Sequence, residues 1–182
     1  MSVELVPVLS RAEIEQKVKR LAERVCRDYD KEELVVLGIL KGSFIFLADL
    51  VRELTIPVQI DFIRLASYGS ETSSSGQIQI TKGIELDIGD RHVLVVEDIV
   101  DSGLTIAYLL DYLKQFHPKS IKVCTFIDKT EHREVQIPVD YAGHVVEFGF
   151  LVGYGLDFDE KYRTLPAIYH LKQIRERSVR CS

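Results

Sequence analysis

Residues 93–105 carry the most informative pattern in the chain and read Val93-Leu94-Val95-Val96-Glu97-Asp98-Ile99-Val100-Asp101-Ser102-Gly103-Leu104-Thr105. The four leading apolar residues predict a strand that is buried on both faces, as in a parallel sheet. Two acidic residues follow at once, and a third, Asp101, begins a short turn. Residues 104–116 then have helical character, and His117-Pro118 ends that helix. A buried strand that leads through acidic residues into a helix indicates an α/β fold with a ligand site at the strand end.

The turn at residues 101–105 has the composition of a phosphate-binding loop. Unpaired N–H groups at a helix N-terminus bind phosphate well. Gly103 lets the backbone approach a ligand closely and take a positive φ, and the hydroxyls of Ser102 and Thr105 add donors. Acidic residues and serine at a helix start are also common N-caps, so capping remains an alternative for Asp101 and Ser102 taken alone.

Glu97 and Asp98 are harder to explain as ordinary structural residues. They directly follow four apolar residues, at a strand end where an unpartnered charge is costly to bury. Neighbouring carboxylates can accept hydrogen bonds from sugar hydroxyls or hold Mg²⁺ among oxygen ligands. We therefore expect a bound cation or a sugar to supply the missing partners.

Strands and helices alternate along the rest of the chain, which predicts a mainly parallel sheet covered by helices. A capping box at residues 10–13 begins the first helix, which should end near residues 29–30. The further predicted helices are residues 44–54 and 104–116. The predicted strands are residues 34–40, 56–62, 77–81, 93–97, 121–127 and 139–148. Ligands bind at the carboxyl ends of such strands, where residues 41–42, 97–105 and 128–129 are expected to meet.

Residues 67–76 contain almost no apolar side chain. Such a stretch is typical of a surface loop, because loops generally run over the surface. A lid over a ligand site is the alternative interpretation. The strand-like residues 77–81 follow, so the loop should join two antiparallel strands.

Bulk properties predict a single globular domain of residues 1–182, since domains commonly hold about 100–200 residues. The net charge of −5 argues against nucleic-acid binding, which needs a basic surface. Cys26, Cys124 and Cys181 lie far apart and suggest neither zinc spacing nor a disulfide framework. No stretch has the pattern of a signal peptide or a membrane span. We expect a cytoplasmic protein with no membrane partner.

Residues 93–105 closely resemble the thirteen-residue phosphoribosyl-diphosphate signature of type I phosphoribosyltransferases. That signature has four apolar residues, two acids, two apolar residues and then Asp-Ser-Gly-x-Thr. A Walker A loop would need a different glycine and lysine spacing, which does not occur here. The resemblance extends over about residues 34–165 and points to the hypoxanthine-guanine phosphoribosyltransferases. The matching segments are residues 38–43, 61–68, 128–130 and 150–157, with Arg163.

The resemblance implies a type I phosphoribosyltransferase fold: α/β, with a mainly parallel central sheet flanked by helices. A small hood would come from the N-terminal segment and parts of residues 135–182. The implied reaction transfers the 5-phosphoribosyl group of phosphoribosyl diphosphate to N9 of a 6-oxopurine, with Mg²⁺ as cofactor. Family members are commonly dimers or tetramers, so a homo-oligomer is implied as well.

The resemblance also implies roles at the phosphoribosyl end. Asp101 would be the general base or acid near purine N7. Glu97 and Asp98 would bind the ribose hydroxyls, directly or through Mg²⁺. The residues implied to hold the 5′-phosphate are Asp101, Ser102, Gly103, Leu104 (through its backbone) and Thr105.

At the purine end, Lys129 would donate to the 6-oxo group, although a lysine past a strand is more often a solvated surface charge. Phe150 would stack on the base and the Leu151 backbone would meet its edge. The residues at 146–150 depart from the family pattern, so Phe148 is an alternative to Phe150. The spacing to residues 152–154 favours Phe150.

Around the pyrophosphate, the resemblance implies Lys41, Gly42 and Arg163. Asp157 would bind Mg²⁺ beside the leaving group and lie near the purine. Ser67 and Tyr68 would begin the loop that excludes water from the reactive cation, which favours the lid interpretation.

Two rival functions stay open. One is a regulatory protein of the same fold that binds RNA or protein. The negative net charge and the presence of Asp101 and Lys129 argue against this function. The other is the same chemistry with a different acceptor, such as xanthine or a pyrimidine. The sequence does not rank hypoxanthine, guanine and xanthine.

Overall fold

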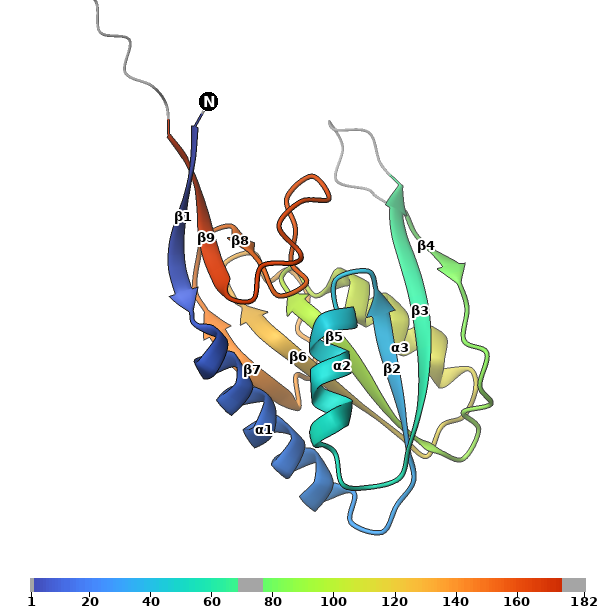
Figure 1. Ribbon diagram of the computed structural model, residues 1–182. Coiled ribbons are helices and arrows are strands. Elements are labelled where there is room, and N and C mark those ends of the chain that lie inside the picture. Colours follow the sequence, from blue (N-terminus) through green and yellow to red (C-terminus); the bar gives the residue numbers. More distant parts are fainter. Residues whose placement is uncertain (1, 69–76, 175–182) are drawn as a thin grey trace, which may run out of the picture.

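The computed structural model describes residues 2–68 and 77–174, and a six-stranded sheet lies at its centre (Figure 1). The strand order is β4-β3-β2-β5-β6-β7; β4 pairs antiparallel with β3 and the other neighbours are parallel. The expected mainly parallel α/β fold is therefore confirmed. The strands are β2 (Leu34–Leu40), β3 (Val58–Tyr68), β4 (Gln77–Lys82), β5 (His92–Val100), β6 (Ser120–Lys129) and β7 (Tyr141–Val146).

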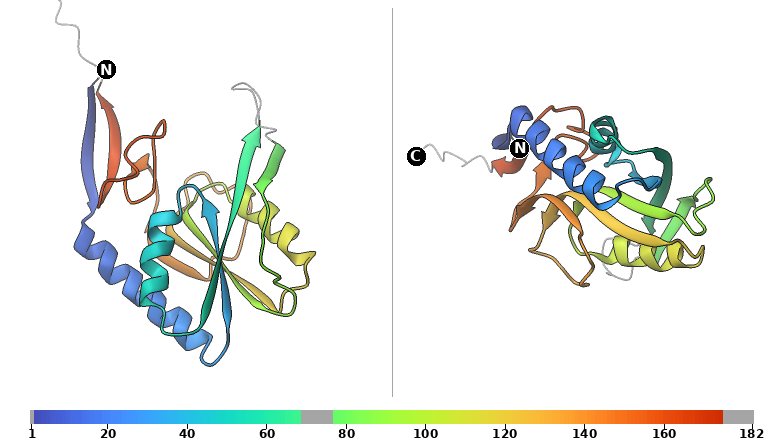
Figure 2. Two further views of the ribbon diagram at one scale, coloured as in Figure 1. Left: turned by 45° about the vertical axis from the view of Figure 1, so that its right-hand side comes forward. Right: turned by 90° about the horizontal axis from the view of Figure 1, so that it is seen from below.

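Helices cover both faces of this sheet (Figures 1 and 2). The helices α1 (Arg11–Asp28) and α2 (Phe44–Glu53) pack on one face, against alternate residues such as Val36 and Leu94. Helix α3 (Leu104–Lys114) packs on the other face, against Val35 and Val93. Because successive strand residues point to opposite faces, a strand covered on both sides is apolar throughout. Within the described ranges, no helix is long and apolar enough to cross a membrane.

Several element ends differ from the sequence-based expectation. The predicted capping box is present, with Ser10 and Glu13 bonded to each other's backbone N–H. The helix expected to reach residue 116 ends at Lys114, because the next amides bond to carbonyls three residues back in a tighter turn. The strand expected at 93–97 continues to Val100, so Glu97 and Asp98 lie inside β5. The last predicted strand is shorter than expected and spans only Tyr141–Val146.

A second sheet brings the N-terminal and C-terminal parts of the described chain together (Figure 2). Its order is β1-β9-β8, with antiparallel pairing throughout. The strands are β1 (Ser2–Leu9), β8 (Leu151–Val152) and β9 (Ile168–Ile174). This sheet arises from the two segments that were expected to form the hood, whereas Tyr141–Val146 joins the main sheet instead. The loop between β8 and β9 lies near the carboxyl ends of β2 and β5 (Figure 1).

Candidate active site

The carboxyl ends of the neighbouring strands β2, β5 and β6 bring the three predicted segments together. Gly42, just after β2, lies so close to Asp98 of β5 that a Cβ on the glycine would be 1.9 Å from the carboxylate Oδ2. Lys129, the last residue of β6, places its Nζ 3.2 Å from Oδ2 of Asp101. These contacts join residues 41–42, 97–105 and 128–129 into one site, as the parallel topology requires.

Residues that follow β6 hold the turn between β5 and α3 through backbone hydrogen bonds. The Ser102 carbonyl accepts hydrogen bonds from the amides of Glu134 and Val135, at 2.9 and 3.0 Å. Gly103 has φ +86°, and a Cβ there would lie 2.5 Å from the Val135 carbonyl oxygen. The position therefore requires glycine for both its conformation and its space.

A hollow of about 150 Å³ opens over this turn at the N-terminus of α3. Helix N-termini present unpaired N–H groups and a partial positive charge, which favour an anion. The side chain of Ser102 accepts from the Leu104 amide at 3.3 Å, so one of these donors is already used. The hollow is lined by Glu97, Ile99, Val100, Asp101, Ser102, Gly103, Thr105 and Ile106.

Glu97 and Asp98 are neighbouring carboxyl groups whose charged forms are unfavourable to bury. Burial raises the pKa of Glu97 well above its ordinary value, and the charge of Asp98 adds to the shift. Burial also raises the pKa of Asp98, against the opposing effect of its hydrogen bonds. The Oε2 atom of Glu97 is inaccessible and has no hydrogen-bond partner among the described residues. A cation or a hydroxyl donor would relieve this cost.

The pyrophosphate candidates also converge, although they come from distant parts of the chain. Arg163 lies 2.8 Å from Oδ1 of Asp157 and donates to the Gly155 carbonyl at 2.8 Å. A Cβ on Gly155 would be 2.1 Å from the Gly42 carbonyl oxygen, so this loop packs directly on the turn after β2. Lys41 and Arg163 are thereby brought to the same carboxylate, that of Glu160.

The predicted metal ligands do not form a closed cage. In the described part of the chain, no group of three or more His, Cys, Asp or Glu side chains is placed to hold a metal ion. Glu97 and Asp98 lie inside β5, and Asp157 is paired with Arg163. This arrangement suits an ion that takes much of its coordination from a substrate and from water.

Lys129, which is predicted to contact the purine, is buried and paired with two carboxylates, those of Asp101 at 3.2 Å and Glu131 at 3.5 Å. The alternative of a solvated surface lysine is therefore wrong. Glu131 also accepts a hydrogen bond from the Gly149 amide at 3.3 Å, which links the lysine to the turn before β8.

Phe150 and Phe148, the two aromatic residues predicted to stack on a base, both have exposed side chains. Phe150 is 49% exposed, and the ring of Phe158 meets it edge-on with centroids 5.5 Å apart. Phe148 is 66% exposed. Leu151 is buried in β8, where it pairs with His170 of β9 and anchors the turn. The preference for Phe150 over Phe148 stays a prediction.

Sequence reasoning missed three charged residues in this region: Glu131, Arg133 and Glu160. Arg133 donates to the carbonyls of Asp101 at 2.8 Å and of Lys129 at 3.1 Å, and it pairs with Asp128. It thus ties the ends of β5 and β6 together. All three residues lie in polar loops, where a charge is typical of a solvated surface, so no local signal marks them.

Ser67 and Tyr68 are the last residues of β3. Their side chains and residues 69–76 lie outside the described part of the structure. The interpretation of this segment as a lid therefore stays a prediction.

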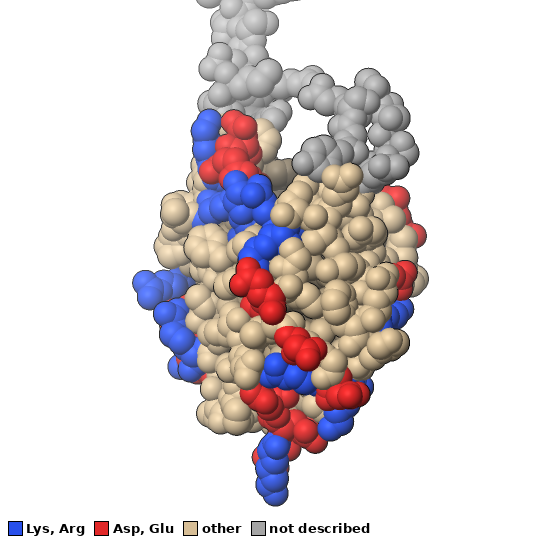
Figure 3. Space-filling model, turned by 90° about the vertical axis from the view of Figure 1, so that its right-hand side faces the viewer, with Lys and Arg blue, Asp and Glu red and all other residues tan. Residues whose placement is uncertain are grey.

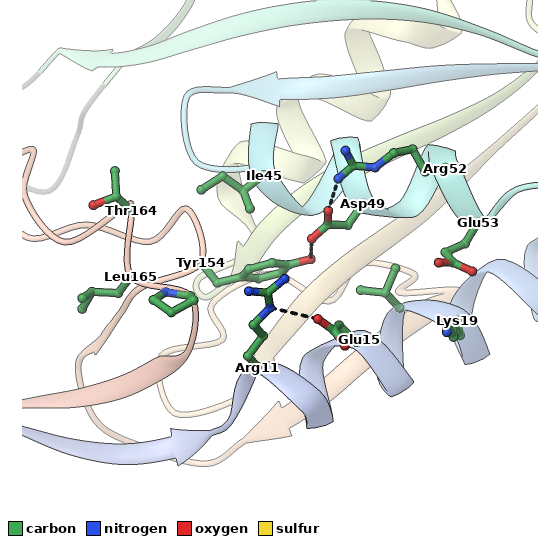
Figure 4. Close-up of a pocket in the computed structure, with 12 residues that line it drawn as sticks. Arg11, Glu15, Lys19, Ile45, Asp49, Arg52, Glu53, Tyr154, Thr164 and Leu165 are labelled. Carbon is green, nitrogen blue, oxygen red and sulfur yellow. Dashed lines mark hydrogen bonds and ion pairs between the residues drawn. The ribbon is translucent and has the colours of Figure 1, made fainter.

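A larger hollow than the one at α3 lies between α1, α2 and residues 164–166 (Figure 4). It measures about 410 Å³ and contains none of the predicted site residues. Its polar groups are already paired in part: the Tyr154 hydroxyl donates to Asp49 at 2.8 Å, and Arg11 meets Glu15 at 2.9 Å (Figure 4). Chemistry, rather than volume, identifies the candidate active site.

Several known proteins with a similar sequence or structure are described as phosphoribosyltransferases. Residues 8–159 match the family described as "Phosphoribosyl transferase domain". A hypoxanthine-guanine phosphoribosyltransferase of Dictyostelium discoideum is 42% identical over 170 residues, covering 91% of this chain and 94% of its own. One from Aquifex aeolicus is 46% identical over 163 residues, covering 89% and 92%. The crystal structure of a Bacillus anthracis hypoxanthine-guanine phosphoribosyltransferase has a TM-score of 0.87 at 41% identity, covering 94% and 100%.

Proposed function

The chain belongs to the phosphoribosyl transferase domain family, and from this premise we propose that it transfers 5-phosphoribosyl from phosphoribosyl diphosphate to N9 of hypoxanthine or guanine. The products are IMP or GMP and pyrophosphate, so the reaction salvages purine bases. Relatives of 40–46% identity that carry this activity in their names support the proposal. The observation that carries it in the structure is the contact between Lys129 and Asp101, beside the hollow at α3.

The reaction forms a bond from purine N9 to the anomeric carbon of the ribose and breaks the bond from that carbon to the pyrophosphate oxygen. Positive charge develops on the ribose ring as the bond to pyrophosphate breaks, and the protein forms no covalent bond in this scheme. Catalysis then rests chiefly on positioning and on charge stabilisation. Asp101 lies at the centre of the site, where it takes up or returns the proton of the base at N7.

The 5′-phosphate is assigned to the turn of residues 101–105. Its backbone N–H groups and the hydroxyls of Ser102 and Thr105 supply the donors. Gly103 and the backbone of Leu104 let the chain pass close to the anion. Glu97 and Asp98 are assigned to the ribose hydroxyls, which would give the unpartnered Oε2 of Glu97 its hydrogen bond.

The carboxylates of Glu97, Asp98 and Asp157 suit Mg²⁺, which prefers oxygen ligands and is often held by one or two carboxylates plus substrate phosphates. Bound Mg²⁺ would supply positive charge to the leaving pyrophosphate. On the protein side, Lys41, Arg163 and the backbone at Gly42 hold the same group. Burial raises the pKa of both Glu97 and Asp98, and a bound cation would stabilise the charged form of each carboxylate.

Lys129 is assigned to the 6-oxo group of the purine, with Phe150 on the ring and the Leu151 backbone at its edge. Adenine carries an amino donor where these bases have an acceptor. A buried donor without an acceptor costs roughly 1–3 kcal/mol, which corresponds to a discrimination against adenine of about 5- to 150-fold.

The test measures pyrophosphate release from phosphoribosyl diphosphate and Mg²⁺, with hypoxanthine, guanine, xanthine, adenine and uracil supplied separately. We expect release with hypoxanthine or guanine and little with adenine or uracil. Asp101→Asn should slow the reaction strongly, because it removes the carboxylate that handles the proton. Asp111→Asn is the matched control, since Asp111 is exposed on α3 and, within the described ranges, pairs with Lys114 alone. No release with any base would refute the proposal.

Other experimental outcomes would identify one of the two alternative functions. Release with xanthine alone would identify a xanthine-preferring enzyme. A regulator that binds RNA would show strong, salt-dependent binding in a titration. The face that carries β3 and β4 mixes acidic and basic side chains rather than forming one basic surface (Figure 3), which does not favour RNA. The dimer or tetramer stays a prediction that light scattering would check.

A further inference from the structure

One carboxylate oxygen stands between the two cations assigned to pyrophosphate. Oε2 of Glu160 lies 3.0 Å from Nζ of Lys41 and 3.4 Å from NH2 of Arg163. The two cations are distant in sequence and meet only because the loop between β8 and β9 packs on the turn after β2. A diphosphate presents the same kind of group, an anionic oxygen, to the same pair of donors.

The backbone around Glu160 holds it in this position. Asp159 and Glu160 both have left-handed backbone conformations, with φ 52° and 59°. The Glu160 amide donates to Oδ2 of Asp157 at 2.9 Å. Phe158 and Lys161 close the turn with a pair of backbone hydrogen bonds of 3.2 and 3.1 Å. This tight turn therefore aims the Glu160 side chain back toward the β2 end.

The side chain itself is free to leave. It is 64% exposed, and among the described residues its side-chain hydrogen bonds and ion pairs are those with the two cations. Arg163, in contrast, is only 17% exposed and keeps its contacts to Asp157 and to the Gly155 carbonyl when Glu160 moves away. Rotation of Glu160 into solvent would thus uncover the two cations without disturbing the arginine.

We propose that Glu160 is an internal competitor for the pyrophosphate end of the site. This inference rests on the proposed function, which assigns Lys41 and Arg163 to that group. The Glu160 carboxylate must leave both cations before a diphosphate binds, so it weakens the binding of phosphoribosyl diphosphate and of product pyrophosphate alike. A weaker hold on the product favours its release and keeps the site from being blocked by pyrophosphate.

The expected size follows from the exposure of the two ion pairs. Exposed pairs are individually weak, and losing two of them before binding corresponds to roughly a 2- to 20-fold loss of affinity. Removing the charge of Glu160 should therefore tighten binding of inorganic pyrophosphate by about that factor. The gain should shrink as salt is added, because exposed charges are screened.

The experiment is calorimetric titration of inorganic pyrophosphate, in the presence of Mg²⁺, into the wild type and three variants. Glu160→Gln keeps the size of the side chain and removes its charge, and Glu160→Asp keeps the charge but shortens its reach. Both should bind pyrophosphate more tightly than the wild type. Asp159→Asn is the matched control, because this neighbouring carboxylate is 77% exposed and pairs with Lys161 instead. It should bind like the wild type.

Equal or weaker binding by both Glu160 variants would overturn the proposal, and so would an equal gain in Asp159→Asn. The result also separates the two levels of inference. If the wild type binds pyrophosphate and releases it in the reaction, but the Glu160 variants do not differ, only the competitor role is wrong. If the wild type neither binds pyrophosphate nor reacts with any base, the proposed function falls and the competitor role falls with it.

Discussion

Replacing Arg133 with alanine is expected to destabilise the protein by about 3 kcal/mol. Arg133 and its partner Asp128 are only 12% and 18% exposed, and the arginine also holds the carbonyls of Asp101 and Lys129. Removing one member of a buried pair costs roughly 3–5 kcal/mol, because the other charge stays buried without a partner. The residual exposure of both side chains favours the lower end of that range.

Urea unfolding of the wild type and the variant measures this loss as a shift of the midpoint. Arg52→Ala is the matched control: its pair with Asp49 involves an arginine that is 70% exposed, so it should cost at most about 1 kcal/mol. A double variant, Arg133→Ala with Asp128→Ala, should lose less than the sum of the single changes, since the two residues share one interaction. A loss for Arg133→Ala no larger than the control, or full additivity, would refute the reasoning.

The same change should affect activity, because Arg133 holds the Asp101 carbonyl at the start of the phosphate turn. A displacement of about 1 Å in a positioning element can cost roughly a hundredfold in rate. Pyrophosphate release should therefore fall in Arg133→Ala even at temperatures where the variant is fully folded. Unchanged turnover in the folded variant would mean that the turn keeps its geometry without the arginine.

Three further predictions follow from the geometry. Gly103→Ala should destabilise the protein by about 1–3 kcal/mol in thermal unfolding, because φ is +86° and a Cβ would meet the Val135 carbonyl at 2.5 Å. Burial and a neighbouring charge raise the folded-state pKa of Glu97, so wild-type stability should fall as pH rises from the ordinary carboxyl pKa toward that raised value. Glu97→Gln should reduce this slope, leaving the smaller part that the raised pKa of Asp98 contributes, and should raise Tm near neutral pH; an unchanged slope would contradict the raised pKa of Glu97. Tyr154→Phe should cost about 1 kcal/mol in urea unfolding, since it loses the hydrogen bond to Asp49 at 2.8 Å.

The central strands and the main site could be predicted from sequence because their signals are local. The apolar runs of β2 and β5 reflect burial on both faces, and the capping box marks the start of α1. Once the strands are parallel neighbours, their carboxyl ends must meet, which brings Gly42 and Lys129 to residues 97–105. Pattern and topology together thus predict that these three segments meet, whereas Phe150, Leu151, Asp157 and Arg163 were expected only from the family resemblance.

The strands β1 and β9 could not be predicted in the same way. The short segment Ser2–Leu9 contains Glu4 and Pro7, which weaken its strand pattern. Its strand character depends on pairing with Ile168–Ile174, and no local rule identifies a partner so far along the chain. Long-range pairing is therefore what limited the prediction of the second sheet.

Charged residues of the loops were missed for a different reason. Arg133 and Glu160 occupy polar stretches, where a charge usually faces water. Their positions depend on carbonyls and cations that other segments supply, such as the Asp101 carbonyl and Lys41. A single sequence carries no sign of such contacts until the fold has brought the segments together.

The pairing of β1 with β9 has a consequence for how the protein is made. During synthesis β1 emerges before the other described elements, whereas its partner β9 emerges after them. At about 5–20 residues per second, β1 waits roughly 10–30 s on the ribosome before it can pair. Pro7 and the charge of Glu4 make the waiting strand a poor template for neighbouring chains. A nascent chain stalled before β9 should therefore contain the main sheet but expose β1 to added protease, whereas the finished protein protects it.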